Sequence, residues 1–195
     1  MAMDMIKQIE NIFEESISLQ NKTCEELSSK IMEAGKLLSQ SLNQGNKILV
    51  CGNGGSASDA QHFSSELVNK FEKDRRALAA IALTTDSSTI TSIANDSNYN
   101  EVFSRQIAAL SKPGDILIAI STSGNSLNII SAVNAAHEGS MGVIALTGNK
   151  GGEIPKILSS SDIELRVASD STARIQEVHA VIIHCLCSLV DNLVT

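Results

Sequence analysis

His62 and Glu66 are the first pair of residues in this chain whose types and spacing could do chemistry. Side chains four residues apart on a helix share one face, so an imidazole and a carboxylate would stand side by side there. Such a pair can move a proton near neutral pH, or supply two ligands to Zn²⁺, which would still need more. A solvent-facing ion pair on an amphipathic helix has the same spacing, so the pair alone does not decide between these interpretations.

A glycine-rich loop comes shortly before this pair. Residues 48–50 (I-L-V) form an apolar run typical of a buried parallel strand, and residues 52–56 (G-N-G-G-S), the glycine loop, lead from it into a helix. Glycines permit left-handed backbone conformations and let a ligand approach bare amides. The helix start adds free N–H groups and the positive end of the helix dipole. The segment therefore predicts an anion-binding loop next to a proton-transfer or metal-binding pair.

A second loop, residues 121–126 (S-T-S-G-N-S), carries the clearest anion signal in the chain. It follows an apolar strand pattern at residues 115–120 and precedes a helical pattern. Hydroxyl groups donate to phosphate oxygens while the amides of a helix start cradle them, so this serine loop predicts a phosphate site. A serine-rich helix cap is the alternative interpretation. The loop lacks the Gly-Lys-Ser/Thr of a P-loop, which argues against hydrolysis of a nucleoside triphosphate.

The glycine loop also matches a loose dinucleotide fingerprint. Gly52, Gly54 and Ala57 fit G-x-G-x-x-A, and Asp86 follows the second predicted strand, where it could bind a ribose. NAD binding is therefore an alternative. A dinucleotide fold does not require a second anion loop after the third strand, which weighs against it.

The C-terminal segment, residues 172–193, has helical periodicity and polar positions that could join a site. These polar positions are Arg174, Gln176, Glu177, His179 and His184. Most other positions are apolar, and a histidine on such a helix is usually a hydrogen-bonded core residue. Gln176 and His184 are eight residues apart, about 12 Å along a helix axis. If both serve one ion, we predict that two copies of the chain contribute them.

The elements that position these residues follow from alternating patterns. Apolar runs at residues 48–50, 79–83, 115–120, 141–146 and 163–167 are separated by helical patterns. This alternation predicts a parallel α/β sheet covered on both faces. Ligands bind beyond the carboxyl ends of strands in such sheets, where both loops would lie. The second strand ends near polar groups that lead on to Asn95 and Asp96.

We expect one domain over residues 1–195, with a helical lead at 1–45 and an α/β core at 46–195. Thr23 and Glu26 resemble a capping box, which predicts that a second helix of the lead begins there. Gly45 is expected to end the lead. Because the lead has too little core of its own, it should pack on the domain or on a second subunit.

Composition excludes several function classes. The net charge of −7 and an aromatic content of 3 % argue against binding nucleic acid. Acidic residues within the N-terminal pattern argue against a signal peptide, and no apolar run reaches the roughly 20 residues of a membrane span. The four cysteines form no C-x-x-C pair, so we expect reduced structural thiols in a cytoplasmic protein.

Together these residues resemble the sugar isomerase (SIS) domain family. The matching segments are C-G-N-G-G-S, H-F-S-S-E-L, A-N-D, I-S-T-S-G-N-S, A-L-T-G-N-K-G-G and R-I-Q-E-V-H with the later histidine. The resemblance implies a three-layer α/β/α sandwich with a five-stranded parallel sheet and an N-terminal helical extension. It also implies a homotetramer with active sites at subunit interfaces. Within the family it points to the branch that converts sedoheptulose 7-phosphate to D-glycero-D-manno-heptose 7-phosphate, the entry to lipopolysaccharide heptose synthesis.

The resemblance also implies roles for residues at the motif positions. Those expected to hold the phosphate are Ser121, Thr122, Ser123 and Ser126. Those expected to line the sugar are Asn53, Gly54, Gly55, Ser56, Asn95 and Asp96, with Glu66 and Gln176. Those expected to bind one Zn²⁺ per subunit are His62, Glu66, Gln176 and His184.

The implied reaction moves a carbonyl from C2 to C1 through an enediol, which requires a base and an acid poised near neutrality. Glu66 is the expected base and His184 the expected acid, with zinc polarising the carbonyl. Two positions depart from the family pattern: Lys70 stands where some relatives have Arg, and Ala173 where some have Asp.

A protein of another class provides the alternative function. The segment C-L-C-S-L-V-D-N and much of the I-A-N-D region are similar to the DnaA initiator-associating protein, a non-enzymatic adaptor of the same fold. An adaptor needs surface patches and no acid–base pair. Glu66 and His184 are both present here, which favours the isomerase.

Overall fold

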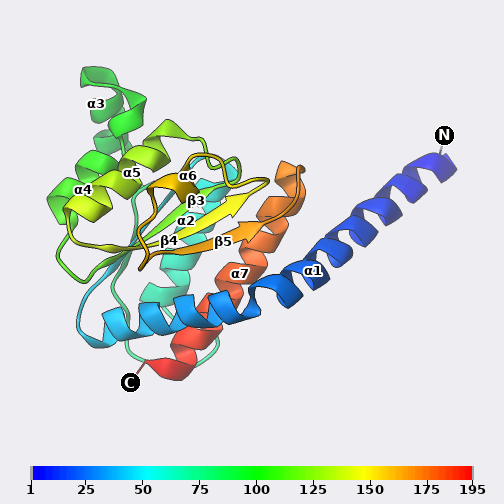
Figure 1. Cartoon of the computed structure of the whole chain (residues 1–195), viewed down its shortest axis with the longest axis horizontal. Helices are drawn as coiled ribbons and strands as arrows, with labels where there is room; N and C mark the ends of the chain where they lie inside the picture. The colour runs from blue at the N-terminus through cyan, green and yellow to red at the C-terminus, as the bar shows by residue number, and fades with distance from the viewer. Residues whose placement is uncertain (1, 195) are drawn as a thin grey trace.

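A sheet of five parallel strands lies at the centre of the structure, a computed structural model that describes residues 2–194, with the side chain of residue 2 left out (Figure 1). The strands are β1 (Ile48–Gly52), β2 (Ala80–Ala82), β3 (Ile116–Ser121), β4 (Gly142–Gly148) and β5 (Ile163–Val167). All neighbours pair in parallel, in the order β2-β1-β3-β4-β5. The predicted five-stranded parallel sheet is confirmed, with some strand boundaries shifted by one or two residues.

Helices cover both faces of this sheet. They are α1 (Ala2–Asn43), α2 (Gly55–Val68), α3 (Ser87–Asp96), the 3-10 helix η1 (Tyr99–Glu101), α4 (Ser104–Leu110), α5 (Leu127–Glu138), α6 (Ile154–Ile157) and α7 (Thr172–Leu193). One hydrophobic core joins the sheet to α1, α2 and α7, and a second joins its other face to α4, α5 and α6. The expected three-layer α/β/α arrangement is therefore confirmed.

Each central strand contributes to both cores because successive side chains of a strand point to opposite faces. In β1, Ile48 and Val50 belong to the core with α1, α2 and α7, whereas Leu49 belongs to the other, and all three are fully buried. This double burial explains why the strands appear in the sequence as continuous apolar runs rather than alternating ones.

The N-terminal lead is one helix of 42 residues, so the predicted start of a second helix at Thr23 is wrong. Thr23 is buried at 6 % exposure, within a stripe that continues through Leu27, Ile31 and Leu38 against α7. This stripe keeps a helical spacing through Thr23, so packing on α7 stabilises an unbroken helix. Thr23 and Glu26, the predicted capping residues, therefore lie inside the helix. The expected packing on the domain holds for this C-terminal half of α1.

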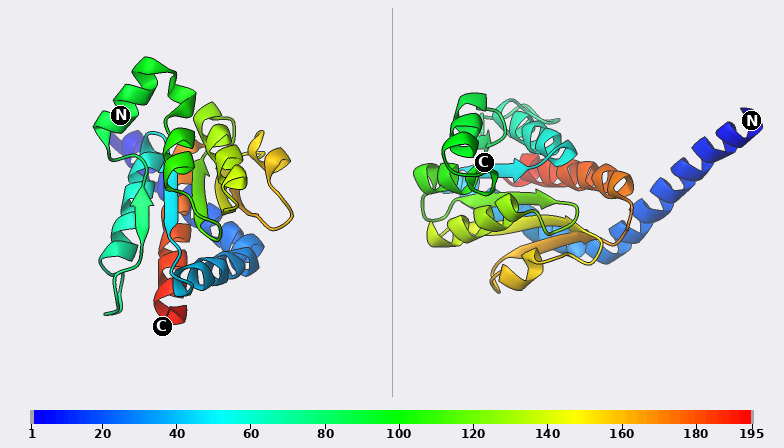
Figure 2. Two further views of the ribbon diagram at one scale, coloured as in Figure 1. Left: turned by 90° about the vertical axis from the view of Figure 1, so that its left-hand side faces the viewer. Right: turned by 90° about the horizontal axis from the view of Figure 1, so that it is seen from above.

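The N-terminal half of α1 extends away from the rest of the chain (Figures 1 and 2). Its large apolar side chains are exposed and recur at helical spacing; they include Met5, Ile9, Phe13 and Ile17. Nothing within one copy of the chain covers this stripe among the described residues.

Helix α7 has the length and composition of a membrane-crossing helix, and it is the one such helix among residues 2–194. However, it packs against α1 and α2, and Ile175, Ile182, Ile183 and Leu186 of α7 lie in the core. These contacts are those of a core helix, which passes the same test of length and composition.

The strand order fixes where a ligand can bind. β2 lies on one side of β1 and β3 on the other, so the direction of the chain across the sheet reverses between β1 and β3. Crevices outside the carboxyl ends of the strands at such a switch point are the ligand sites of open parallel sheets. The glycine loop follows β1 and the serine loop follows β3, so both lie at this position.

Candidate functional site

The glycine loop leaves the start of α2 open. Gly54 is the N-cap of α2 with a φ of 54°, a left-handed conformation that favours glycine, and it offers no side chain to the first turn. Within the described part of the chain no side chain caps this first turn, and the amides of Ala57 and Ser58 donate to the carbonyl oxygen of Gly54. Ser56 is buried at 3 % exposure, and its amide donates to the carbonyl oxygen of Asn53.

The serine loop closes on itself. Ser121, at the end of β3, is buried, and its hydroxyl donates to that of Ser126 over 3.2 Å. Ser126 is the N-cap of α5, but in the chain as described its side chain accepts no hydrogen bond from the first turn. The amides that start α5 are thus available for an anion, as the phosphate prediction requires. Thr122 is half-buried and Ser123 is exposed.

A segment that follows β4 supports the serine loop from behind. Gly124 has a φ of 66°, and a Cβ there would lie 1.7 Å from the carbonyl oxygen of Gly151. The amides of Glu153 and Ile154 donate to the carbonyl oxygen of Gly124 over 3.0 and 3.1 Å. Gly151, near the end of the motif A-L-T-G-N-K-G-G, and the two residues that follow this motif therefore hold the shape of the serine loop.

A pair of asparagines joins the two loops. Asn53 and Asn128 donate to each other's side-chain oxygens over 2.9 and 2.8 Å. Asn128 lies in the first turn of α5 and is buried at 3 % exposure. Asn128 was not among the predicted site residues, because no motif marks it and its partner is 75 residues away in the chain. Tyr99 also donates to the side-chain oxygen of Asn53.

The imidazole–carboxylate pair gains a third member from α7. The Nε2 atom of His62 lies 3.2 Å from Oε1 of Glu66 and 3.4 Å from Nε2 of His184. The two histidine rings meet edge to face with centroids 5.0 Å apart, and the ring of Phe71 stacks on His184 at 5.5 Å. The structure therefore brings together the expected base, the expected acid and His62, with Glu66 only 23 % exposed at its side chain.

These distances match the spacing between ligands of a tetrahedral zinc ion. Histidine nitrogens and carboxylate oxygens lie about 2.0–2.2 Å from zinc, so two ligand atoms of a tetrahedron are about 3.4 Å apart. A separation of 3.4 Å between His62 and His184 is also longer than an ordinary N–H hydrogen bond. Imidazole and carboxylate groups are donors that zinc accepts. However, among residues 2–194 no group of three or more His, Cys, Asp or Glu side chains is placed to hold a metal ion.

Gln176 lies elsewhere on α7 from His184. A Cβ added to Gly55 would come within 2.4 Å of the Gln176 side-chain nitrogen, so Gln176 covers the glycine loop. His184 is about two turns further along α7, where it contacts His62. His62 is in turn about two turns from the start of α2. One chain therefore places Gln176 with the predicted sugar-binding residues. The prediction that Gln176 and His184 reach one ion only from different copies stays a prediction.

Asn95 and Asp96 lie apart from the two loops in this chain. They end α3, which stands away from the sheet in Figure 1, and both are exposed. The Asn95 side chain donates to Asp96 over 2.8 Å. Among the described residues, neither side chain forms a hydrogen bond with the glycine loop or the serine loop. Their contact with the sugar therefore stays a prediction.

Asp59 is a half-buried titratable group one turn from His62, and His179 is a fully buried one on α7. Burial raises the pKa of Asp59, and the charge of His62 opposes that shift. Its Oδ2 atom is buried and has no hydrogen-bond partner among the described residues. His179 is a core histidine, as expected for an apolar helix: its Nε2 atom lies 2.9 Å from the carbonyl oxygen of Thr147.

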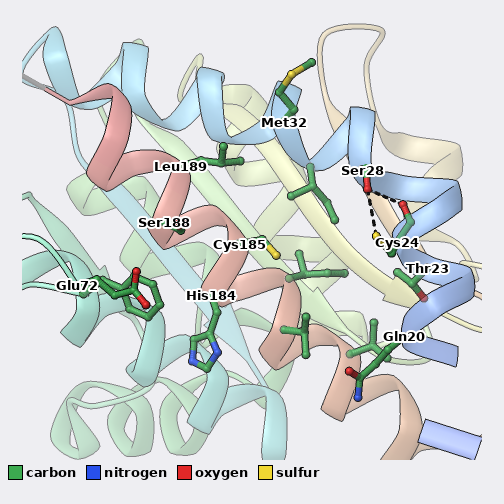
Figure 3. Close-up of a pocket in the computed structure, with 15 residues that line it drawn as sticks. Gln20, Thr23, Cys24, Ser28, Met32, Glu72, His184, Cys185, Ser188 and Leu189 are labelled. Atoms are coloured by element: carbon green, nitrogen blue, oxygen red, sulfur yellow. Dashed lines mark hydrogen bonds between the residues drawn. The ribbon is translucent and has the colours of Figure 1, made fainter. Parts of the chain in front are cut away.

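A groove of about 560 Å³ lies between α1 and α7 (Figure 3). His184 borders it, but the serine loop does not. Figure 3 shows Cys185 pointing into the groove toward α1, whereas His184 leaves α7 in another direction. The cysteines are free, with Cys51 and Cys187 buried, as expected of reduced thiols.

Comparison with known proteins agrees with this geometry. Residues 12–148 match the sequence pattern of the SIS domain family. The chain is 57 % identical over 190 residues to the phosphoheptose isomerase of Coxiella burnetii, with 97 % of this chain and 96 % of that protein covered.

Solved structures give the same result. The phosphoheptose isomerase from Neisseria gonorrhoeae is 46 % identical with a TM-score of 0.92, covering 96 % of this chain and 99 % of that one. That from Francisella tularensis is 47 % identical with a TM-score of 0.94, covering 96 % and 98 %. The similarity thus extends over nearly the whole length of each relative.

Proposed function

The chain belongs to the SIS domain family, and from that premise we propose that it is an aldose–ketose isomerase that converts sedoheptulose 7-phosphate to D-glycero-D-manno-heptose 7-phosphate. Relatives that match nearly end to end are named phosphoheptose isomerase. The observation that carries the proposal is the group of His62, Glu66 and His184 beside two loops suited to an anion. The reaction begins lipopolysaccharide heptose synthesis, in the cytoplasm.

The serine loop holds the phosphate in this proposal. The hydroxyls of Ser121, Thr122, Ser123 and Ser126 and the open amides of α5 donate to its oxygens. Asn53 and Gln176, with the glycine loop, then lie against the sugar chain. The phosphate grip is formed by the end of β3, the serine loop and the start of α5, whereas the base is on α2 and the acid on α7.

Proton transfer is the task of α2 and α7. Glu66 removes the proton from the carbon next to the carbonyl, and His184 supplies the proton needed at oxygen, so that an enediol forms and collapses to the isomer. Nε2 of His62 lies between these two side chains, 3.2 Å from Oε1 of Glu66 and 3.4 Å from Nε2 of His184. An adaptor without catalysis would have no use for this group.

One Zn²⁺ per subunit fits the same residues. His62 lies at ligand spacing from both Glu66 and His184, and Gln176 is the fourth proposed ligand. Glu66 would act as ligand and as base in turn, because a lone pair bound to zinc cannot accept a proton. Because Gln176 lies at Gly55 in its own chain, a copy from a second subunit would complete the set. When bound, zinc polarises the substrate carbonyl.

We propose that the active assembly is a homotetramer. Its support is the exposed apolar stripe on the N-terminal half of α1, where Phe13 is 63 % and Ile9 55 % exposed. Contiguous exposed apolar surface of this kind marks a contact with another protein.

An isomerisation assay on sedoheptulose 7-phosphate tests the proposal directly. Glu66→Gln and His184→Ala should each lower kcat by about 10²–10⁴-fold, the usual contribution of general acid–base catalysis. His137→Ala is the matched control, because His137 is also paired with a carboxylate, Asp162, but lies on α5 away from the loops. Wild-type turnover unaffected by both site changes would refute the assignment, and binding to DnaA without turnover would favour the adaptor.

A further inference from the structure

A guanidinium group caps the end of the helix that carries Glu66. Helix α2 ends at Val68, and its last carbonyl oxygens have no partners within the helix. Arg75 donates from Nη2 to the carbonyl oxygen of Glu66 over 2.8 Å and from Nη1 to that of Leu67 over 2.9 Å. A cation at this end also complements the negative end of the helix dipole. Arg75 thus binds the backbone of Glu66 itself.

Asp191 holds Arg75 in place from α7. Its Oδ1 atom accepts a hydrogen bond from Nε of Arg75 over 2.7 Å, and its side chain is only 2 % exposed. Burial alone would raise the pKa of Asp191, but the amides of Lys73 and Glu72 and the Arg75 guanidinium hold it below its ordinary value. The pair is therefore a charged, nearly dry contact between the loop after α2 and the last turns of α7.

The same carboxylate also holds the loop over His184. Oδ2 of Asp191 accepts hydrogen bonds from the amides of Glu72 and Lys73, both over 3.0 Å. Phe71, the residue before Glu72, stacks its ring on His184. Glu72 and His184 both line the groove drawn in Figure 3. Asp191 and His184 are seven residues apart, so they lie on a similar face of α7.

We propose that Arg75 and Asp191 are positioning residues that set the distance and orientation between Glu66 and His184. The inference rests on the proposed isomerase function. One end of the network binds the backbone of Glu66, and the other fixes the loop whose aromatic ring holds His184. Neither residue touches the serine loop, so the network acts on proton transfer and not on the phosphate grip.

The chain contains a matched control for this network. Asp115 likewise accepts hydrogen bonds from two backbone amides, those of Lys47 and Lys112, and pairs with the ammonium group of Lys47. Its side chain is 1 % exposed, compared with 2 % for Asp191. However, it precedes β3, at the end of the sheet opposite the loops. We expect Asp115→Asn to lower the stability of the protein without changing the positions of Glu66 and His184.

The experiment compares Asp191→Asn and Arg75→Lys with Asp115→Asn. Misplacement of catalytic groups by about 1 Å can cost about 100-fold, so we expect kcat to fall by about 10–100-fold in the first two. We expect their KM to stay within about threefold of wild type, since the grip on the phosphate is untouched. Asp115→Asn should keep kcat while lowering the midpoint of urea unfolding to a similar degree as Asp191→Asn.

Zinc affinity, measured by competition with a chromophoric chelator, gives a readout that needs no sugar phosphate. Removing residues that orient ligands typically weakens metal binding by about 10–100-fold, which we expect for Asp191→Asn but not for Asp115→Asn. Wild-type kcat and zinc affinity in Asp191→Asn would overturn the inference, as would equal losses in Asp115→Asn. If the wild type fails to turn over sedoheptulose 7-phosphate, the proposed function fails, and the zinc comparison alone decides the positioning role.

Discussion

His179 makes the stability of this protein dependent on pH in a way that the structure predicts. The ring is fully buried on α7, with Nε2 against the carbonyl oxygen of Thr147 and Nδ1 without a partner among the described residues. Burial lowers its pKa from the ordinary 6.5 to about 4, although the hydrogen bond with Thr147 acts in the opposite direction. The folded chain therefore holds this histidine neutral at pH values where an unfolded chain protonates it.

The sign and size of the effect follow from linkage. Between pH 6.5 and about 4 the unfolded state binds a proton that the folded state does not, so stability falls as the pH is lowered. The contribution is complete above pH 6.5 and lost by about pH 4. At about 1.4 kcal/mol per pH unit, the difference is on the order of 3 kcal/mol. That is a large part of the roughly 5–15 kcal/mol by which a domain is stable.

Urea unfolding of the wild type and His179→Gln at several pH values between 4 and 8 measures this contribution. The glutamine keeps a donor for Thr147 but does not titrate, and the carboxylates common to both proteins cancel in the difference. The gap between the two unfolding free energies should change by on the order of 3 kcal/mol between pH 7 and pH 4. Both proteins must be compared at one protomer concentration, because association adds to apparent stability. Curves that stay parallel over this range would refute the reasoning.

Three further predictions concern the serine loop, the hydrophobic core and the proposed metal. Gly124→Ala would force a Cβ into the carbonyl oxygen of Gly151 at a left-handed φ, so we expect KM to rise by about tenfold or more from the distorted serine loop; an unchanged KM would contradict this. Phe63→Ala, in a fully buried position, should lower the free energy of unfolding in urea by about 3–5 kcal/mol, and a loss under about 1 kcal/mol would contradict the packing. Removal of metal with EDTA should abolish isomerisation and zinc should restore it; full activity in metal-free protein would exclude the proposed zinc role.

Much of the fold could be predicted because its signals are local. The limits of β5 and of α7 match the predicted residues 163–167 and 172–193, since each is a run with one clear period. The break expected at Thr23 was wrong because the capping signal is local, while the packing on α7 that overrides it is not. Helix α6, of four residues, is too short to show a helical period and was not predicted.

The site was predictable to the extent that its residues fall in motifs. The motifs named His62, Glu66 and His184, and the structure brings these three side chains together from two helices. They did not name Asn128, because its partnership with Asn53 exists only once the sheet places the two loops side by side. For the same reason no spacing rule indicates that Arg75 binds Asp191, 116 residues away.

This fold is shared by proteins of many functions, but here two separate sets of elements carry two groups of polar residues, and this arrangement supports a single function. Fold alone does not imply function, and a phosphate grip at the end of β3 would suit an adaptor or regulator as well as an enzyme. What distinguishes the enzyme is the second pair of elements, α2 and α7, which run side by side and hold a carboxylate and two imidazoles within hydrogen-bond or ligand distance. Because the proposed phosphate grip and the proposed proton-transfer group stand on different elements, changes in the first should alter KM and changes in the second should alter kcat. A chain in which Glu66 and His184 changes altered only KM would carry the fold and the grip of an isomerase without its chemistry.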